Sequence, residues 1–331
     1  MGLNTFLQAF EDEIPVLQVF AHQVCSRELA ANGNRIRDRL VEDYLRLVAQ
    51  TFLHMGTKDP HLSSFGKIDF RIQCTISMWE KIEPHPHQVK PIPVQVLWQV
   101  CFIAQHLPPD SVFLCALADM IIIAFFFLLR PGEYTDAPSD TFPFRSMYVQ
   151  LSIDDRRLDI AMCSLAELSQ ARFASLTFTD QKNRVRGEVT GLACSGDPYP
   201  CPVLALILIR HITHLWANSA SSNTPIVRVF HHPNSPSKSK VTPAVITKQL
   251  RQAVQFLGPD LGFLLLDVLA QSLRAAGATA LLVARVDTGI IRFLGRWRSD
   301  EMLRYLYLQA APIMANYARL MLQSEYTLIP N

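Results

Sequence analysis

The sequence has little net charge, no pattern of paired cysteines and no secretion signal. Among its 331 residues, 31 lysines and arginines face 29 aspartates and glutamates, which leaves a formal net charge of only +2. Any affinity for phosphate must therefore come from local clusters of basic residues and not from a bulk cationic field. The composition, 49% hydrophobic and 18% charged, is that of a globular chain of about two domains.

The cysteines and histidines do not form a metal-binding pattern. The seven cysteines are odd in number, include no C-x-x-C pair and mostly lie within apolar runs, which favours reduced thiols. His85, His87, His231 and His232 flank prolines without a nearby carboxylate or cysteine, so no metal site is predicted. The first residues, MGLNTF, do not combine a basic, an apolar and a small-residue region, and we expect a protein that is not secreted.

The longest apolar run, Val112 to Leu129, ends directly in the motif Arg130-Pro131-Gly132-Glu133. Its eighteen residues barely match the roughly 30 Å of hydrocarbon in a bilayer, and Asp119 near the middle would be costly in lipid. The run is either a membrane span with a basic stop or a core helix that carries an arginine to the rim of a catalytic pocket. We favour the core helix and expect no membrane association.

Hydrophobic periodicity divides the chain into a helical first part and a mixed second part. In RDRLVEDYLRLVAQTFLHM, apolar residues recur at helical spacing. The segment IEPHPHQVKPIP, residues 82–93, holds four prolines in twelve residues and is predicted to be a linker. We therefore expect a helical domain at 1–85, a linker and the start of a second domain at 86–105, and the body of the second domain at 106–331.

The second part also contains strand patterns. RSMYVQLSI and FASLTFTDQKNRVRGEVTG alternate β-branched or aromatic residues with others, and Asp180 to Asn183 form a polar turn between two such runs. This predicts a short sheet with a hairpin near Lys182. From Pro202 onward the patterns are helical again, so the predicted fold is mainly α with a small antiparallel β-sheet.

The residues that could act on a phosphodiester follow one order along the chain. They are Arg130, Glu133, Lys182, Arg274, Trp297 and Tyr305. This order resembles the catalytic domain of tyrosine recombinases, the lambda-integrase-like DNA strand-exchange enzymes, over roughly residues 110–325. The sequence motifs LLRPGEY, TFTDQKNRVRGE and LGRWRSDEMLRYL are most similar to those of the recombinases of Crypton-type mobile elements of eukaryotes. The resemblance implies an all-α, core-binding-like N-terminal domain that clamps DNA and an α+β integrase-like catalytic domain.

The chemistry that these residues would perform follows from the negative charge that develops in the transition state of the reaction. Phosphodiester transfer develops negative charge on the non-bridging oxygens, which preorganised guanidinium groups stabilise. The resemblance implies that Arg130 and Arg274 clamp the phosphate, that Tyr305 attacks phosphorus to form a 3′-phosphotyrosyl intermediate and that Lys182 protonates the leaving oxygen. Trp297 would donate its indole N–H to the phosphate, and no metal, ATP or other cofactor is needed.

Two departures from the family pattern bear on activity. Gln271 stands three residues before Arg274, where the family usually has histidine, and an amide cannot titrate near neutrality. The protein is thus either a site-specific recombinase or a catalytically lapsed DNA-binding or interaction protein. The His/Trp position usually precedes the nucleophile by nine residues. Trp297 precedes Tyr305 by eight and Arg296 by nine, so that either residue could take this place, and Tyr307 is the backup nucleophile.

Basic residues near these motifs suggest how double-stranded DNA would be held. Glu133 would orient neighbouring cations, and the expected phosphate contacts are Arg184 and Arg186 in the hairpin, Arg298, and Arg35, Arg37 and Arg71 in the first domain. The resemblance also implies a DNA-dependent homotetramer that assembles through the C-terminal helix, Ala311 to Gln323. It implies a nuclear protein if the host is eukaryotic, and a cytoplasmic one otherwise.

Overall fold

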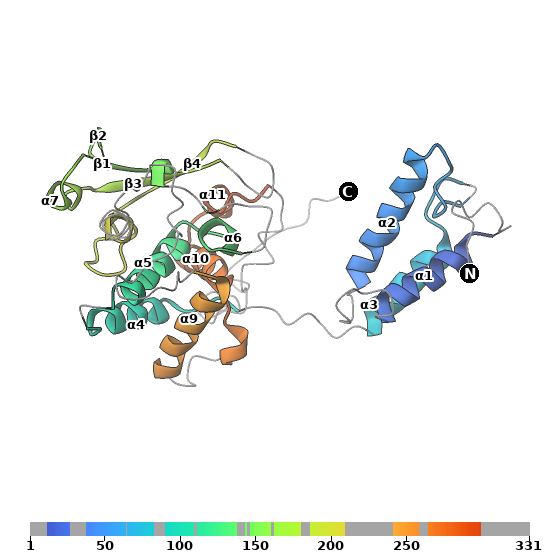
Figure 1. Ribbon diagram of the computed structural model, residues 1–331, viewed down its shortest axis with the longest axis horizontal. Coiled ribbons are helices and arrows are strands. Elements are labelled where there is room, and N and C mark those ends of the chain that lie inside the picture. Colours follow the sequence, from blue (N-terminus) through green and yellow to red (C-terminus); the bar gives the residue numbers. More distant parts are fainter. Residues whose placement is uncertain are drawn as a thin grey trace, which may run out of the picture. The chain divides into compact units, whose positions relative to one another are not determined.

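The computed structural model describes residues 12–26, 38–63, 65–82, 90–108, 111–137, 143, 146–159, 162–179, 186–208, 241–257 and 264–298. Contacts between residues divide the chain into two compact units, Met1–His87 and Gln88–Asn331. Figure 1 labels their helices and strands. Among the described residues, no helix is both long and apolar enough to cross a membrane.

The described part of the first unit contains three helices, α1 (Ile14–Ser26), α2 (Asp38–His54) and α3 (Phe70–Ile82). Each helix places an apolar stripe against the other two, and the shared core includes Leu17, Val41, Leu45, Ile72 and Trp79. The helical pattern expected for this part of the chain is therefore observed.

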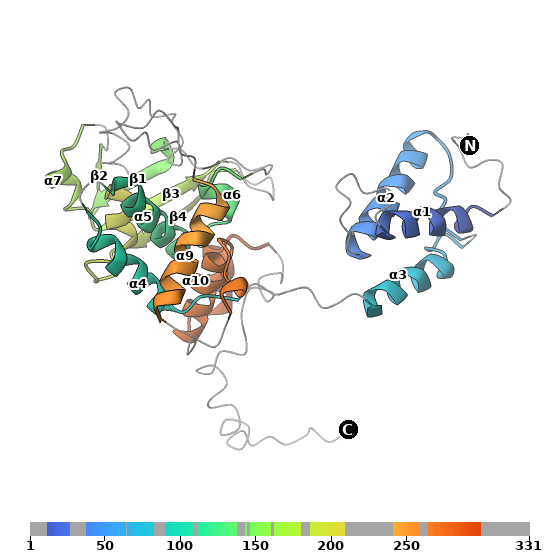
Figure 2. The same ribbon diagram turned by 60° about the horizontal axis from the view of Figure 1, so that its bottom comes forward.

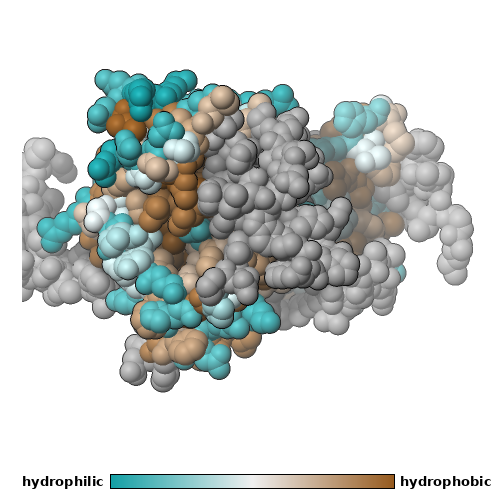
Figure 3. Space-filling view, turned by 60° about the vertical axis from the view of Figure 1, so that its left-hand side comes forward, coloured by the Kyte–Doolittle hydropathy of each residue, from teal (hydrophilic) through white to brown (hydrophobic). Residues whose placement is uncertain are grey.

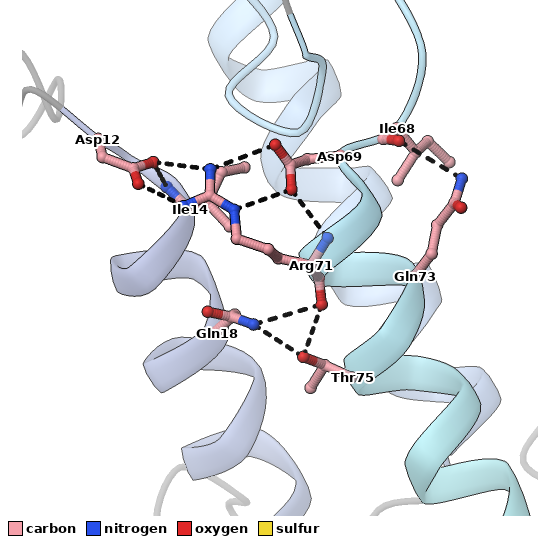
Figure 4. A network of polar contacts seen from close by, with 8 residues as sticks. All are labelled: Asp12, Ile14, Gln18, Ile68, Asp69, Arg71, Gln73 and Thr75. Carbon is pink, nitrogen blue, oxygen red and sulfur yellow. Dashed lines mark hydrogen bonds and ion pairs between the residues drawn. The ribbon is translucent and has the colours of Figure 1, made fainter.

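Polar contacts connect α1 to α3 at the surface of the first unit (Figure 4). Arg71 is bound by Asp12 and Asp69, with 3.1 Å from Arg71 Nη2 to Asp12 Oδ1 and 3.0 Å from Arg71 Nε to Asp69 Oδ1. Lower on the same helices, Gln18 Nε2 donates to Thr75 Oγ1 at 2.9 Å. Two carboxylates thus neutralise Arg71 within its own unit, which makes it a poorer phosphate ligand than its sequence position suggested.

The second unit surrounds the long apolar helix α5 (Val112–Phe126), which packs against α4 (Val94–Gln105), α9 (Pro243–Leu257) and α10 (Ser272–Val283). Figure 2 shows α4, α5, α9 and α10 gathered in one bundle. The apolar run needs no polar face, because side chains from Ala116 to Leu129 are buried almost without interruption. The prediction that the run is a core helix is in agreement with this packing.

Besides the helical residues 202–208, five shorter helical segments belong to the described part of the second unit. They are α6 (Pro131–Tyr134), α7 (Leu165–Leu168), α11 (Thr288–Leu294) and the two 3-10 turns η1 (Ser146–Tyr148) and η3 (Leu265–Asp267). The chain leaving the proline-rich segment is fixed to η3, since Lys90 Nζ lies 3.1 Å from Asp267 Oδ2 and the Lys90 amide donates to the Asp267 carbonyl. Asp267 is itself buried, so the start of the second unit is anchored next to α10.

A four-stranded antiparallel sheet lies beside the helices (Figure 1). Its strands β1 (Val149–Ile153), β2 (Arg156–Leu158), β3 (Phe173–Phe178) and β4 (Glu188–Ala193) are arranged in the order β2-β1-β3-β4. Leu151 pairs with Ala174 and Leu176 with Thr190, and all four side chains are buried on the face toward the helices. The predicted mainly helical fold with a small antiparallel sheet and a β3–β4 hairpin is confirmed, while Lys182 lies outside the described residues.

The surface of the second unit is not uniformly polar. On α4, Val94, Trp98 and Phe102 occur four residues apart and remain exposed. The face of the molecule drawn in Figure 3 likewise carries hydrophobic residues among hydrophilic ones.

Asp119 is the one charged side chain inside α5, and it is buried. Within the described part of the chain no cation pairs with it, and burial raises the pKa of its carboxyl well above the usual range. Between the unfolded and the folded pKa the folded chain binds more protons than the unfolded one. The stability of the second unit should therefore fall as the pH rises through this interval.

We predict that Asp119→Asn raises the free energy of unfolding at pH 8 by about 1–3 kcal/mol, because the amide carries no charge to desolvate. The difference should vanish below about pH 3, where the carboxyl is protonated in both the folded and the unfolded state. Urea unfolding at several pH values measures it, with the exposed Asp155→Asn as control. Equal effects of both substitutions at pH 8 would contradict burial as the cause.

Candidate functional site

The candidate site begins where two helices end in the same unusual way. After α5, Leu128 adopts a left-handed conformation (φ 50°), and the amides of Leu128 and Leu129 donate to the carbonyls of Phe125 and Ala124. This is the Schellman pattern, in which glycine normally takes the left-handed position. A leucine there costs on the order of 1 kcal/mol, so neighbouring contacts must hold the turn.

Helix α11 ends in the same way. Gly295 is its C-cap, Arg296 is left-handed (φ 57°), and the Arg296 and Trp297 amides donate to Phe293 and Arg292 at 3.0 Å each. The turn needs glycine at position 295, because a Cβ atom there would lie 1.5 Å from the Trp297 ring. The sequence Gly-Arg-Trp thus places an arginine and a tryptophan at a helix end.

Two arginines fill the space between these helix ends. Arg274 of α10 is 2% exposed, and its guanidinium donates to the carbonyls of both Leu128 and Gly295. Arg296 donates from Nη1 to the Phe127 carbonyl at 3.1 Å. Free carbonyls at a helix C-terminus carry partial negative charge, so both cations lie where that charge is concentrated.

The approach of α10 to α5 depends on a second glycine. A Cβ atom at Gly277 would lie 2.3 Å from the Phe125 carbonyl oxygen and from Leu128 Cδ2. Backbone can therefore contact backbone at this crossing, and Arg274, one turn earlier on α10, reaches the end of α5.

Glu133 connects the two sides of the site. Its carboxylate accepts from the Arg130 amide (2.8 Å) and from Arg130 Nη1 (2.9 Å), which fixes the first turn of α6. The same carboxylate accepts from Arg296 Nη2 at 2.7 Å. Residues 130 and 296, far apart in the sequence, are therefore joined through one buried carboxylate.

The charges of the site do not cancel. Three guanidinium groups, those of Arg130, Arg274 and Arg296, surround the Glu133 carboxylate, and Glu188 also attracts Arg296. Burial alone would raise the pKa of Glu133, but Arg296, Arg274 and Arg130 outweigh burial and hold that pKa below its usual value. Glu133 is consequently ionised at neutral pH, and the site keeps an excess of positive charge that suits an anion.

Trp297 lies under this cluster. It is buried with Leu128, Ala278 and Ile291, and the Arg274 guanidinium carbon lies 4.1 Å from the centre of its ring. A cation over an indole face is an attractive arrangement that also fixes the plane of the guanidinium. In this conformation Trp297 positions Arg274, and the predicted contact of its indole N–H with a phosphate stays a prediction.

A cleft of about 810 Å³ lies between α9 and the start of α10, and Pro131, the residue after Arg130, is on its wall. Its wall includes Pro131, Thr247, Lys248, Arg251 and Gln271. Lys248 and Gln271 are exposed, whereas Arg251 donates from Nε to the Val268 carbonyl at 3.1 Å. Sequence reasoning missed Lys248 and Arg251, although both lie on the polar face of an amphipathic helix pattern.

The structure brings five of the residues singled out in the sequence into contact. They are Arg130, Glu133, Arg274, Arg296 and Trp297. Gln271, the N-cap of α10, lies one turn before Arg274 and faces the cleft. Of the five, Arg130 has the most accessible side chain, since 24% of it is exposed against 1% for Arg296.

The remaining predicted residues are either exposed or outside the described ranges. Arg186 and Arg298 are exposed. The others lie outside the described residues: Lys182, Arg184, Tyr305, Tyr307, Arg35 and Arg37, as does the segment Ala311 to Gln323. Arg296 and Trp297 both belong to the site, Arg296 on Glu133 and Trp297 beneath Arg274.

Comparison with known proteins assigns the fold. No protein-family model matches the chain, and no curated protein matches it. The chain resembles the Tn1549 transposon integrase, solved in complex with transposon right end DNA, with a TM-score of 0.50 and 12% identity over 94% of this chain and 86% of that one. It also resembles the XerH site-specific recombinase bound to palindromic difH substrate, with a TM-score of 0.51 and 13% identity over 96% and 76%. The chain therefore has the fold of the tyrosine recombinases.

We predict that Glu133→Gln lowers the free energy of unfolding of the second unit by about 3–5 kcal/mol, because it leaves buried guanidinium groups without their counter-charge. Since the folded pKa of Glu133 is lowered, its stabilising contribution is present above the unfolded pKa and is lost as the pH falls through the folded pKa. The variant should consequently lose less stability on acidification than the native chain.

The matched control is Glu167→Gln, an exposed residue in the capping box of α7 that glutamine can also complete. Urea unfolding at pH 7 and pH 4 measures both variants. If Glu133→Gln were as mild as Glu167→Gln at pH 7, the carboxylate would not be the centre of the cluster.

Proposed function

We propose that this protein cuts and rejoins DNA strands as a site-specific recombinase, with Tyr305 as the nucleophile of a 3′-phosphotyrosyl intermediate. The observation that carries the proposal is the meeting of Arg130, Arg274 and Arg296 around Glu133, within a fold shared with a transposon integrase and a site-specific recombinase. An excess of positive charge in a buried, preorganised cluster stabilises the negative charge that develops during phosphoryl transfer.

The arginines would contribute in different ways. Arg130 has the most accessible side chain, so it would contact the non-bridging oxygens directly. Arg274 and Arg296 donate hydrogen bonds to helix-end carbonyls. They would stabilise the phosphate through their charge, at short range in a medium of low dielectric constant. Gln271, on the cleft wall, would donate an amide hydrogen bond to the phosphate in place of the usual histidine.

The covalent step is assigned from the resemblance of the sequence motifs, because Tyr305 and Lys182 lie outside the described residues. The Tyr305 phenolate would attack phosphorus, forming a tyrosine–phosphorus ester while the bond to the 5′-oxygen breaks, and Lys182 would protonate that oxygen. The 5′-hydroxyl of another strand would reverse the step and release Tyr305. The ester conserves the bond energy, so the reaction requires neither ATP nor a metal ion.

DNA would be held by phosphate contacts along the cleft and around it. Lys248 and Arg251 on α9, with the exposed Arg186 and Arg298, would bind the backbone near the site. The first unit would also bind the duplex, with Arg35 and Arg37 as its phosphate ligands. A tetramer on DNA, assembled through the segment Ala311 to Gln323, belongs to the same proposal.

The proposed recombinase subgroup and location rest on sequence motifs. The motifs LLRPGEY and LGRWRSDEMLRYL favour a recombinase of a Crypton-type mobile element, and with it a nuclear location in a eukaryotic host.

A second function is supported by two observations. Gln271 cannot exchange protons near neutrality, and Arg274 and Trp297 are buried in contacts with each other and with the backbone. The alternative is a DNA-binding or interaction protein that keeps the fold without strand cleavage. This alternative predicts DNA binding without any covalent adduct.

For DNA binding, we predict that Lys248→Gln weakens affinity for double-stranded DNA about 3- to 10-fold at low salt. It should also reduce the slope of log affinity against log salt by about 1, because one phosphate contact is lost. Arg157→Gln, an exposed arginine of β2 away from the cleft, is the charge-matched control. Equal losses for the two variants, measured by fluorescence anisotropy, would exclude the cleft as a DNA site.

For catalysis, we predict that the protein forms a denaturation-resistant covalent adduct with DNA. The substrate is a suicide-nicked duplex that carries the end sequences of the proposed mobile element. Tyr305→Phe should abolish the adduct and leave DNA binding unchanged, and Tyr307→Phe should preserve both. An adduct that forms with Tyr305→Phe but not with Tyr307→Phe would identify Tyr307 as the nucleophile. DNA binding without an adduct in the native chain would favour the lapsed alternative.

A further inference from the structure

The loop after β4 begins and ends with a cysteine. Its eight residues, CSGDPYPC, run from Cys194 to Cys201 and lead into helical residues 202–208. The Cys194 amide donates to the Arg172 carbonyl at 2.9 Å, and the Cys201 carbonyl accepts from the Ala205 amide at 3.0 Å. One cysteine is therefore fixed to the sheet and the other to the first turn of a helix.

The residues between the two cysteines form a compact turn. Gly196 is left-handed (φ 83°), the Asp197 amide donates to Ser195 Oγ at 3.1 Å and the Tyr199 amide donates to Asp197 Oδ1 at 2.9 Å. These bonds hold the loop folded back on itself and keep its two ends close.

The two thiols lie within hydrogen-bonding reach of each other. Cys194 is partly exposed and also lies 3.6 Å from the Ala171 carbonyl oxygen, whereas Cys201 is 4% exposed. Both are free cysteines in this structure. Two thiols that interact directly are the starting arrangement from which a disulfide bond can form.

The surroundings make the two thiols unequal. Burial alone would raise the pKa of Cys201, but hydrogen bonds from the amides of Leu204, Ser195 and Val203 hold that pKa below its usual value. Burial raises the pKa of Cys194, and the neighbouring Cys201 thiolate raises it further. By contrast, burial raises the pKa of Cys101 to about 12, so that thiol stays protonated.

We propose that Cys194 and Cys201 are a redox pair that closes to an intrachain disulfide when the protein meets a small-molecule disulfide such as oxidised glutathione. Cys194, the accessible thiol, attacks one sulfur of glutathione disulfide after losing its proton, forms a mixed disulfide and releases a first glutathione. The Cys201 thiolate attacks the Cys194 sulfur, breaks the mixed disulfide and releases a second glutathione. Overall, two thiols are oxidised and one glutathione disulfide is reduced.

The bond would connect the last strand of the sheet covalently to the helical core. The side chains of Val203, Leu206 and Ile207 lie in that core, and β4 pairs with β3 along its whole length. The proposal is independent of the recombinase assignment, since it concerns thiol chemistry alone and its test requires no DNA.

The test exposes the full-length folded chain to oxidised glutathione, blocks the remaining thiols and maps the peptides by mass. We expect a peptide that links Cys194 to Cys201 with the loss of two hydrogens, while the exposed Cys74 carries glutathione and reports that the reagent acted. In the urea-unfolded chain the link should form at least about tenfold more slowly, because its preorganisation is lost.

Two variants separate the steps. Cys201→Ser should accumulate glutathione on Cys194, and Cys194→Ser should leave Cys201 unmodified, because it is buried. If a variant folds poorly, the peptide map of the native chain still tests the proposal. A stable glutathione adduct on Cys194 in the native chain, or two unreacted thiols while Cys74 is modified, would overturn the proposal.

Discussion

The arrangement that the second unit depends on is the contact between two helix ends through buried arginines. Helices α5 and α11 both end with a non-glycine residue in the left-handed conformation, which costs free energy and leaves carbonyls unpaired. Arg274 and Arg296 satisfy those carbonyls, and Glu133 provides the counter-charge. This explains why a long apolar run ends abruptly in Arg-Pro-Gly-Glu: the polar residues complete the end of the helix that the apolar residues build.

The same arrangement gives the site its chemical character. Three guanidinium groups outnumber the carboxylates of Glu133 and Glu188 near them and leave a positive centre, and the surrounding core strengthens its field. Most of that charge is bound internally, so that the exposed part of Arg130 and the cleft wall with Gln271 are the places where an external anion can make contact. In the proposed function, stability and anion binding would therefore depend on the same residues, and a substitution in the cluster would affect both.

Much of the fold could be predicted because its signals are local. The polar turn at 180–183 between two strand patterns predicted the β3–β4 hairpin, and Asp119 within the apolar run argued for a protein core. The Arg130–Glu133 spacing fits one helical turn. What could not be predicted depends on tertiary contacts: the left-handed Arg296 that directs its side chain to Glu133, the capture of Arg71 by Asp12 and Asp69, and the cleft that brings Lys248 beside Gln271.

The direct test of the account is a double-mutant cycle between Glu133→Gln and Arg296→Met, with the free energy of unfolding of the second unit as the readout. If the pair joins the two sides of the site, the double variant should lose less free energy of unfolding than the two single variants lose together. The difference, the coupling energy, should be at least about 1.5 kcal/mol. Additive losses, with a coupling energy below about 0.5 kcal/mol, would contradict the central role assigned to this contact.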